Sequence, residues 1–360
     1  MTTVNKPIRV LVVDDSPLVC HVLTAMIQSD PQLRVVGMAS NGAEAIQRTT
    51  ELNPDLITMD VRMPGMDGLE ATKQIMAFHP TPILILTASL AKQAPDLPFQ
   101  AMMYGALDVI DKGLLRLGEH TANGSALLTE RIKMLARVKV IPHPLARIEA
   151  RGRVPVKPHV AHVPTDRIVA IAASTGGPQA LEKVLKALPA DLGCGIVIVQ
   201  HIAPSFDKGL VEWLDSQCSF SVQLASQNAR VEAGVVSVAP TGQHLRVAEG
   251  GRLRLTDEPP CEGQKPSGTI LFESVAQVYG ARAVAVVLSG MGRDGAAGAQ
   301  QIQRAGGRVI AQDEASCVVF GMPKAAIELG VVDLVQPLDQ IASTIVAALR
   351  PGFGKGRPRA

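Results

Sequence analysis

Short apolar runs alternate with helix-like stretches in this 360-residue chain, and this alternation constrains its fold more than any other feature. Apolar runs of this length predict buried strands, and the stretches between them have helical spacing. In the first 120 residues the predicted strands are Ile8–Val13, Arg34–Met38, Leu56–Met59, Ile83–Leu86 and Val109–Ile110, with helices at Leu18–Ile27 and Ala43–Glu51. The pattern predicts an α/β fold, with a doubly wound (βα)5 parallel sheet in this block.

A second block with the same alternation begins at Arg167. Its predicted strands are Ile168–Ala173, Ile196–Val199, Ala283–Leu288, Arg308–Ala311 and Val332–Val335, with helices at Ala180–Leu188 and Ile341–Leu349. Three further short runs, Val235–Ala239, Leu245–Val247 and Leu253–Leu255, surround Gly250-Gly251 and predict a β-hairpin insertion. We expect a second doubly wound, mainly parallel sheet that carries this hairpin.

Charge is divided along the chain in a way that indicates separate modules. Residues 1–120 carry 9 Lys and Arg against 13 Asp and Glu, residues 121–166 carry 8 against 3, and residues 167–360 carry 18 against 17. The basic segment also holds Pro142, Pro144, Pro155, Pro158 and Pro164, a density typical of a semi-rigid linker. We predict domains at 1–120 and 166–350, a linker at 121–165, and a flexible tail at 351–360. The linker charge is either a solvated surface or a contact for a partner.

Composition excludes several classes of protein. Aromatic residues make up only 3% of the chain and the net charge is +2, which argues against nucleic-acid binding. The five cysteines form no CxxC pair and are odd in number, which favours reduced thiols. No stretch reaches the roughly 18 apolar residues of a membrane-spanning helix, and the first residues do not read as a signal peptide. We therefore expect a cytoplasmic protein that does not insert into membranes.

Three carboxylates follow strands of the first block, Asp14 and Asp15 after the first strand and Asp60 after the third. Carboxyl ends of parallel strands meet at one edge, so these side chains should repel one another unless a hard cation such as Mg²⁺ is bound. Thr87 and Lys112 end the fourth strand and follow the fifth. Asp14-Asp15 alone could be solvated turn residues, but the whole set favours a phosphoryl acceptor.

Residues 8 to about 120 resemble the receiver domain of two-component response regulators. The matching segments are Val12–Ser16, Asp60–Gly68, Thr87-Ala88 and Asp111-Lys112. The resemblance implies that a histidine kinase phosphorylates Asp60 and that Asp14, Asp15, Asp60 and the Arg62 backbone carbonyl hold Mg²⁺, while Thr87 and Lys112 contact the phosphoryl group. Two positions depart from the usual receiver pattern: Val109 stands where many receivers have a switching aromatic, and Gly113 where proline is usual.

A serine, a histidine and an aspartate follow three strands of the second block. Ser174 lies on a Gly-rich turn between a strand and a helix, where backbone N–H groups can face an oxyanion. A nucleophile elbow has the pattern Gly-x-Ser-x-Gly, and here Ala172 stands in place of its first glycine. By itself this turn could therefore equally be a phosphate cradle or a helix cap. His201 and Asp294 end or follow two other strands, so the three residues satisfy the requirements of a Ser-His-Asp triad.

Residues 167–349 resemble the catalytic domain of the bacterial chemotaxis methylesterase and glutamine deamidase family (CheB). The segments that carry the resemblance are Ala173–Pro178, Gln200-His201, Val238–Pro240, His244-Leu245, Pro266-Ser267, Leu288–Gly295 and Ala311–Pro323. The resemblance implies that Ser174 is the nucleophile, His201 the general base and then acid, and Asp294 the orienting carboxylate. It also implies that the Met291 N–H and the Thr175 region face the oxyanion. Besides Ala172, Gly268-Thr269 departs from the Val-Asp pair that the family more often has. His244, next to the hairpin, is either a residue that supports the site or contacts substrate, or a surface histidine, which we expect.

The implied function is hydrolysis of glutamate γ-methyl esters on chemoreceptors, with release of methanol, and deamidation of receptor glutamines. The resemblance implies no cofactor for this esterase reaction, a monomeric protein, and a receiver that covers the Ser174 edge until Asp60 is phosphorylated. A response regulator with a DNA-binding output domain is the opposing hypothesis, but the second block is neither basic nor patterned as a helix-turn-helix. A paralogue that performs the same chemistry in another signalling pathway remains open.

Overall fold

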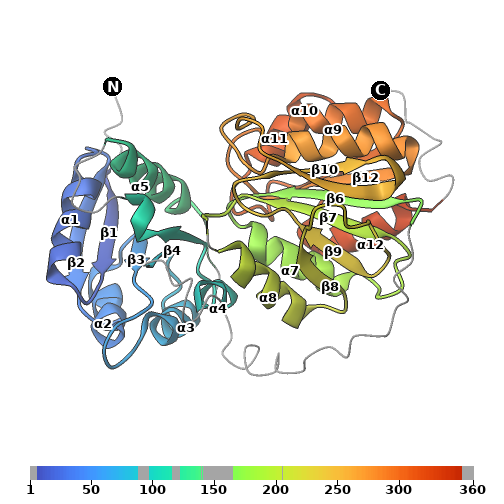
Figure 1. The fold of residues 1–360 in the computed structure, drawn as a ribbon. Coiled ribbons are helices and arrows are strands. Elements are labelled where there is room, and N and C mark those ends of the chain that lie inside the picture. Colours follow the sequence, from blue (N-terminus) through green and yellow to red (C-terminus); the bar gives the residue numbers. More distant parts are fainter. Residues whose placement is uncertain are drawn as a thin grey trace. The chain divides into compact units, whose positions relative to one another are not determined.

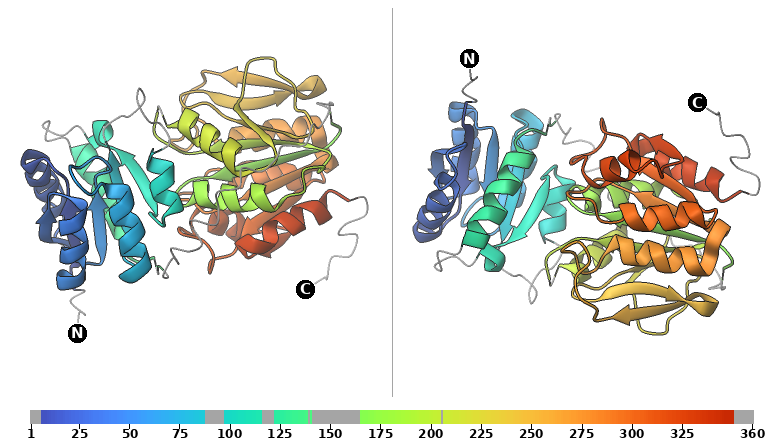
Figure 2. Two further views of the ribbon diagram at one scale, coloured as in Figure 1. Left: turned by 90° about the horizontal axis from the view of Figure 1, so that it is seen from below. Right: turned by 90° about the horizontal axis from the view of Figure 1, so that it is seen from above.

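The computed structural model describes residues 6–87, 97–115, 122–138, 140, 165–204 and 206–350. The chain divides into two compact units, residues 1–153 and 154–360. Each unit contains a parallel β-sheet with helices on both faces, as the ribbon and its two turned views show (Figures 1 and 2). This is the α/β architecture that the alternating sequence pattern predicts.

The first unit has a five-stranded parallel sheet in the order β2-β1-β3-β4-β5. Its strands are β1 (Ile8–Val13), β2 (Leu33–Ala39), β3 (Leu56–Met59), β4 (Ile83–Thr87) and β5 (Asp108–Asp111). Its helices are α1 (Pro17–Gln28), α2 (Gly42–Leu52), α3 (Gly68–Phe78), α4 (Leu97–Met103), the 3₁₀ helix η1 (Lys112–Leu115) and α5 (Ala122–Leu135). Helices α1 and α5 pack together on one face, and α2, α3 and α4 lie on the other (Figure 1).

Helix α5 lies within residues 121–165, which the sequence analysis assigned to a linker. Its side chains Leu128, Ile132 and Leu135 are fully buried, and the helix packs against α1. Two basic residues of this segment pair with acids of the first unit: Arg131 Nη1 lies 2.6 Å from Asp108 and Lys133 Nζ 2.7 Å from Asp30. The first unit therefore extends at least through α5. The proline-rich residues that follow lie outside the described part of the chain, as does the tail at 351–360.

The second unit has a seven-stranded sheet in the order β14-β13-β12-β6-β7-β9-β8, in which every neighbouring pair is parallel. The strands are β6 (Ile168–Ala173), β7 (Gly195–Gln200), β8 (Ser221–Leu224), β9 (Val235–Val238), β12 (Ala283–Val287), β13 (Arg308–Gln312) and β14 (Leu334–Gln336). Strands β10 (His244–Ala248) and β11 (Arg252–Thr256) form the predicted hairpin around the short helix η2 (Glu249–Gly251). The run Val235–Ala239 was wrongly grouped with this hairpin, because as β9 it pairs in parallel with β7 inside the main sheet.

Helices cover both faces of the second sheet. They are α7 (Gly177–Ala187), α8 (Asp207–Gln217), α9 (Gly268–Tyr279), η3 (Gly280–Arg282), α10 (Ala296–Arg304), α11 (Met322–Glu328) and α12 (Leu338–Ala348). Helices α7, α8 and α12 lie on one face, whereas α9, α10 and α11 lie on the other together with the β10–β11 hairpin (Figure 1). All six residues of β6 are fully buried, which explains why a continuous apolar run marks this central strand in the sequence.

The strand order places a topological switch point beside β6. From β6 the chain builds the sheet outward through β7, and after the hairpin it returns to add β12 on the opposite side of β6. Open α/β sheets bind ligands at the carboxyl ends of strands at such a point. The segments that follow β6, β7 and β12 are therefore the expected walls of a functional site.

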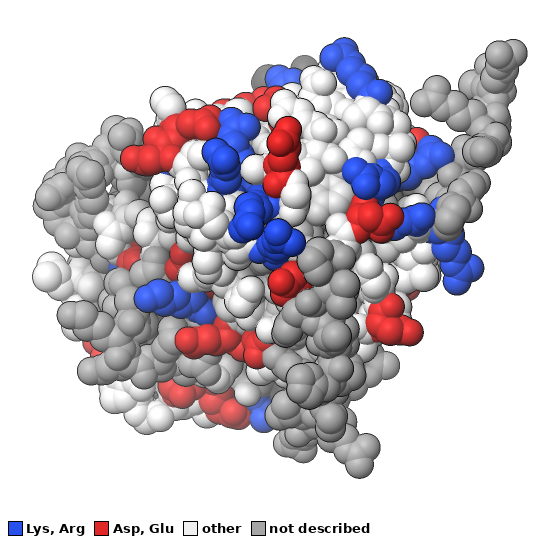
Figure 3. Space-filling model, turned by 45° about the vertical axis from the view of Figure 1, so that its right-hand side comes forward, with Lys and Arg blue, Asp and Glu red and all other residues white. Residues whose placement is uncertain are grey.

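On the face drawn in Figure 3 neither positive nor negative side chains dominate, because a short strip of basic side chains is flanked by acidic ones. Among the described residues, no helix is both long and apolar enough to cross a bilayer.

Candidate active site and phosphoacceptor site

The three carboxylates predicted to gather in the first unit do so. One carboxylate oxygen from each of Asp14, Asp15 and Asp60 lies within 4.8 Å of the others. Asp14 and Asp60 are buried, whereas Asp15 is exposed. The backbone N–H of Asp60 donates to Val13 O at 2.9 Å, which ties the end of β3 to the end of β1. Three hard oxygen donors, one of them open to solvent, fit a Mg²⁺ ion that keeps some of its water ligands.

Lys112 joins this cluster from the start of η1. Its Nζ lies 2.6 Å from Asp14 Oδ2 and 2.9 Å from Asp60 Oδ2. Burial acts to lower the pKa of Lys112, but the charges and hydrogen bonds of Asp60 and Asp14 outweigh it and raise the pKa. Burial also raises the pKa of Asp60, against the opposing effect of Lys112. Lys112 is therefore a fixed positive charge beside the predicted phosphoacceptor.

The remaining predicted residues lie around the same edge. Thr87 is the buried last residue of β4 and pairs in register with Asp111 of β5. Gly113, where a proline was noted as usual, uses its backbone N–H to donate to Asp111 Oδ1 at 2.7 Å, a bond that proline could not form. Val109, the position of the missing aromatic, is half-buried in β5.

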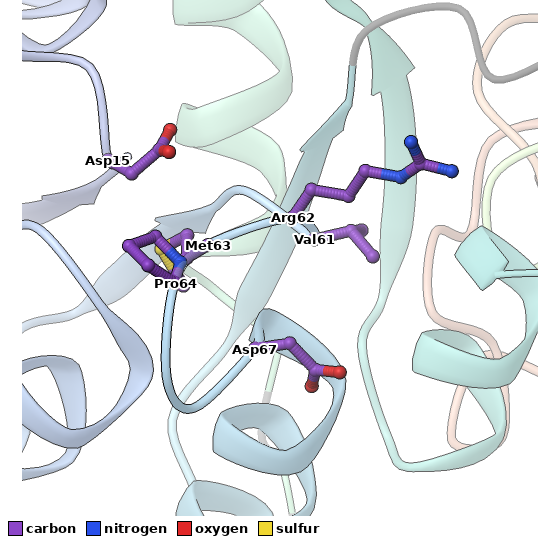
Figure 4. A pocket seen from close by; sticks show the side chains of 6 residues that line it. All are labelled: Asp15, Val61, Arg62, Met63, Pro64 and Asp67. Atoms are coloured by element: carbon purple, nitrogen blue, oxygen red, sulfur yellow. The ribbon is translucent and has the colours of Figure 1, made fainter.

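A pocket of about 440 Å³ opens beside the acidic cluster, and it is lined by Asp15, Val61, Arg62, Met63, Pro64 and Asp67. Figure 4 shows Asp15 and Asp67 on opposite sides of Met63 and Pro64, with the Arg62 side chain extending away from Asp15. Asp67 caps α3 by accepting the Glu70 N–H at 2.9 Å. The pocket gives a small molecule access to the exposed side of the cluster.

In the second unit, Ser174 sits on the turn between β6 and α7. Its N–H donates to Ser289 O at 3.0 Å, and its C=O accepts the Gly177 N–H at 2.8 Å and the Gln200 Nε2–H at 2.8 Å. Gly176, with φ of 75°, makes the sharp turn in a conformation that other residues rarely adopt. The backbone that carries Ser174 is therefore held from β7, α7 and the loop after β12.

His201 and Asp294 are hydrogen-bonded to each other, as the triad prediction requires. His201 follows β7, and its N–H donates to Ala173 O at 3.0 Å, which places it beside Ser174. Its ring Nε2 lies 2.8 Å from Asp294 Oδ2, whereas its buried Nδ1 has no hydrogen-bond partner among the described residues. Because an ionised Asp294 can only accept, Nε2 carries the proton and Nδ1 is the basic nitrogen. In serine proteases the roles are exchanged, since Nδ1 donates to the aspartate and Nε2 is the base.

Ser174 Oγ forms no hydrogen bond to His201 in the described part of the chain. Such contacts are often long before substrate binds and tighten only in the reacting complex. The two residues are nonetheless neighbours, because Ala173 and Gln200, which directly precede them, are paired in register between β6 and β7.

The start of α9 holds Asp294 through contacts that the sequence analysis did not predict. Ser267 Oγ and the Thr269 N–H donate to Asp294 Oδ1 at 2.6 and 3.0 Å, and the Gly268 N–H donates to Oδ2 at 2.6 Å. Burial is the largest single effect and acts to raise the pKa of Asp294, but the hydrogen bonds from His201, Ser267 and Thr269 outweigh it and lower the pKa to about 2. Asp294 therefore stays ionised throughout the neutral range.

His244 was predicted to be a surface histidine, and that prediction is wrong because its side chain is fully buried. Its Nδ1 accepts the Ser267 N–H at 3.2 Å, so its Nε2 carries a proton and donates to Pro259 O at 3.1 Å. The loop that follows β11 covers the ring. A neutral His244 thus supports Ser267, which in turn holds Asp294.

The loop after β12 completes the site. Gly290 lies so close to Ser174 that a Cβ at position 290 would come within 2.7 Å of Ser174 Cβ. Ser289 Oγ donates to Thr175 O at 2.7 Å and accepts the Val319 N–H at 3.0 Å. The Met291 N–H makes no hydrogen bond among the described residues, and the Met291 side chain is 42% exposed. The Met291 N–H is therefore available to an incoming oxyanion.

Replacing Ser267 with alanine is expected to lower kcat about 10- to 100-fold and to leave KM unchanged. The reason is that the carboxylate loses a donor worth about 1.5–3 kcal/mol, while its two backbone donors remain. Kinetics on a methyl ester of the kind that the resemblance implies, with Ser267→Thr as the hydroxyl-retaining control, would measure this. A full rate in Ser267→Ala would show that the backbone donors alone position Asp294.

The two units define a class of protein, a response regulator whose receiver is followed by a doubly wound α/β domain with a candidate serine hydrolase site. Residues 10–117 match the family profile "Response regulator receiver domain", and residues 169–345 match "CheB methylesterase".

Relatives match over nearly their whole length. A protein of Anaeromyxobacter dehalogenans named protein-glutamate methylesterase/protein-glutamine glutaminase 3 is 46% identical over 95% of this chain and 99% of its own. A protein of Symbiobacterium thermophilum named protein-glutamate methylesterase/protein-glutamine glutaminase is 38% identical over 97% of this chain and 99% of its own. The solved methylesterase catalytic domain of Thermotoga maritima CheB is 37% identical, covering 52% of this chain and 98% of its own, with a TM-score of 0.49. The chain belongs to the protein-glutamate methylesterase/protein-glutamine glutaminase (CheB) family.

Proposed function

We propose that this protein is a phosphorylation-activated serine hydrolase of chemotaxis. It hydrolyses glutamate γ-methyl esters on chemoreceptors and deamidates specific receptor glutamines. The observation that carries the proposal is the His201–Asp294 pair, 2.8 Å apart, beside Ser174 at the switch point of the sheet. Relatives of nearly full coverage that are named for both activities support it.

The esterase reaction follows from the positions of these side chains. Ser174 Oγ attacks the ester carbonyl and gives its proton to His201 Nδ1, the ring nitrogen that Asp294 leaves without a partner. Asp294, ionised at neutral pH, stabilises the imidazolium through Nε2. The Met291 N–H and the Thr175 region stabilise the oxyanion.

Three further proton transfers through His201 complete the cycle. The imidazolium protonates the leaving oxygen, methanol departs, and an acyl-enzyme remains on Ser174. His201 then takes a proton from water, which attacks the acyl group. The imidazolium returns this proton to Ser174 Oγ as the acyl bond breaks and glutamate leaves. With a glutamine side chain the leaving group is ammonia and the product is the same carboxylate. This esterase chemistry uses side chains and backbone groups of the chain itself.

The receiver supplies regulation. We propose that Asp60 takes a phosphoryl group from a chemotaxis histidine kinase. Asp14, Asp15, Asp60 and the Arg62 carbonyl would hold Mg²⁺, which neutralises charge around the transferred phosphoryl oxygens when it is bound. Lys112, already 2.9 Å from Asp60, and Thr87 would contact the phosphoryl group. Esterase activity is expected to rise when Asp60 is phosphorylated.

The proposal also covers the setting of the enzyme. It acts as a monomer in the cytoplasm on the cytoplasmic part of membrane-bound receptors, without entering the membrane itself. Boundaries of the receiver, the linker and the catalytic domain near residues 1–120, 121–165 and 166–350 stay a prediction, adjusted at the first boundary to include α5.

Methanol release tests the function directly. The full-length protein is mixed with a chemoreceptor carrying radiolabelled methyl esters, with and without a small phosphodonor, and volatile label is counted. We expect methanol release that increases with the phosphodonor, and mass spectrometry should show specific glutamines converted to glutamate. If chemoreceptors yield neither product, the substrate lies in another signalling pathway and the chemotaxis assignment fails.

A further inference from the structure

The β10–β11 hairpin carries arginines on its outer face. In the antiparallel register Arg246 stands directly opposite Arg254, and Ala248 stands opposite Arg252. Leu245, Val247 and Leu253 alternate with these residues and are buried against α9. Arg230 from the preceding loop forms an isolated bridge with Arg252. We call these four residues, Arg230, Arg246, Arg252 and Arg254, the arginine surface.

This arrangement is unfavourable for the hairpin itself, because like charges directly opposite each other on paired strands destabilise a sheet. Only Arg246 is neutralised, since its Nε and Nη2 donate to Glu258 at 3.0 and 2.7 Å. Arg252 donates to a neutral group, the backbone carbonyl of Asn228, at 3.1 Å. Arg230 and Arg254 form no ion pair among the described residues, and both are exposed. Apart from Arg246, the arginine surface thus carries positive charges that form no ion pair with an acidic side chain of the described residues.

Hydrogen bonds connect the start of the hairpin to the active site. His244, on the same face of β10 and two residues before Arg246, accepts the Ser267 N–H, and Ser267 Oγ donates to Asp294. At about 3.4 Å per residue, the Arg246–Arg254 pair lies about 7 Å along the hairpin from His244, and Arg252 about 14 Å. The hairpin arginines therefore lie on the element that supports Ser267 and, through it, Asp294.

We propose that the arginine surface binds acidic side chains next to the reacting group on the substrate chain, so that the enzyme prefers glutamate-rich segments. This inference rests on the proposed function, since ester hydrolysis and deamidation both turn a neutral side chain into glutamate. On a helical substrate, carboxylates one turn apart are separated by about 5 Å, which is comparable with the roughly 7 Å between the Arg246–Arg254 pair and Arg252. Segments that already carry free glutamates should bind better than fully methylated ones.

The test is the double variant Arg252→Gln/Arg254→Gln in the full-length protein. Its matched control is Arg304→Gln/Arg350→Gln, which removes the same charge from two exposed residues, one at the end of α10 and the other after α12. For a methylated chemoreceptor we expect the KM of the hairpin variant to rise about five- to tenfold with kcat unchanged. The KM of the wild type should rise with NaCl more steeply than that of the hairpin variant.

Hydrolysis of p-nitrophenyl acetate, a small uncharged ester, separates recognition from damage to the active site. The hairpin variant should cleave this probe at the wild-type rate. A receptor KM equal to that of the control variant would overturn the proposal. So would a hairpin variant that keeps its receptor KM but loses binding to vesicles of phosphatidylglycerol, because the arginines would then recognise a lipid surface. Failure of the proposed function looks different, since then the wild type itself releases no methanol.

Discussion

Alanine in place of Ser174 is expected to lower methanol release from methylated receptor by at least about 10⁴-fold, because no other group can form the acyl-enzyme. The loss should lie in kcat, since the backbone around position 174 is held by its own hydrogen bonds to Ser289, Gly177 and Gln200. Ester hydrolysis and glutamine deamidation should fall together, because both pass through the same serine.

A matched control for this variant is Ser289→Ala, which removes a hydroxyl from the loop after β12, beside Ser174, and leaves the nucleophile in place. Its Oγ bridges Thr175 O and the Val319 N–H, so we expect a partial loss of rate that leaves turnover measurable. Both variants should accept a phosphoryl group on the receiver at the wild-type rate, and an unchanged far-UV circular dichroism spectrum would show that the second unit is folded as well. Methanol release by Ser174→Ala within tenfold of the wild type would contradict the proposed mechanism.

The strands that the sequence predicted best are those buried on both faces. Predictions for Ile8–Val13, Leu56–Met59 and Ile168–Ala173 match β1, β3 and β6 residue for residue, because continuous apolar runs ended by polar residues leave little choice of boundary. Strand β8 was missed, since only one of its four residues is buried. Helix α9 was missed for the opposite reason: it is buried on several sides, so its sequence lacks the polar stripe that marks a surface helix.

The same contrast holds for the site. Ser174, His201 and Asp294 could be found because each follows a strand of one sheet, and parallel strands bring such positions together. Ser267 could be recognised from sequence only as a helix cap, beside Pro266 and Gly268. Its hydrogen bond to Asp294 depends on how α9 packs against the loop after β12, which no local pattern records. The burial of His244 likewise depends on the loop after β11, which leaves the hairpin at Thr256, opposite His244, and brings Pro259 O to the ring.

Asparagine in place of Asp60 is expected to abolish incorporation of label from radiolabelled acetyl phosphate. An amide cannot act as the nucleophile, and neither neighbouring carboxylate occupies the same place, because Asp14 and Asp15 follow β1 whereas Asp60 follows β3. The wild type should take up a hydroxylamine-labile label only in the presence of Mg²⁺, and EDTA should prevent the uptake, because a phosphoryl group adds negative charge to three clustered carboxylates that Lys112 alone does not neutralise.

The matched control is Asp55→Asn, the same change at the opposite end of β3, where an exposed carboxylate only accepts the Arg9 N–H at 2.7 Å. It should be labelled like the wild type. If Asp60 is the regulatory residue, the Asp60→Asn protein keeps its basal esterase rate, because Ser174, His201 and Asp294 are untouched, but acetyl phosphate no longer raises that rate. Label on Asp60→Asn would place the phosphoacceptor elsewhere, whereas normal labelling of the wild type without a gain in methanol release would separate the receiver from control of the esterase.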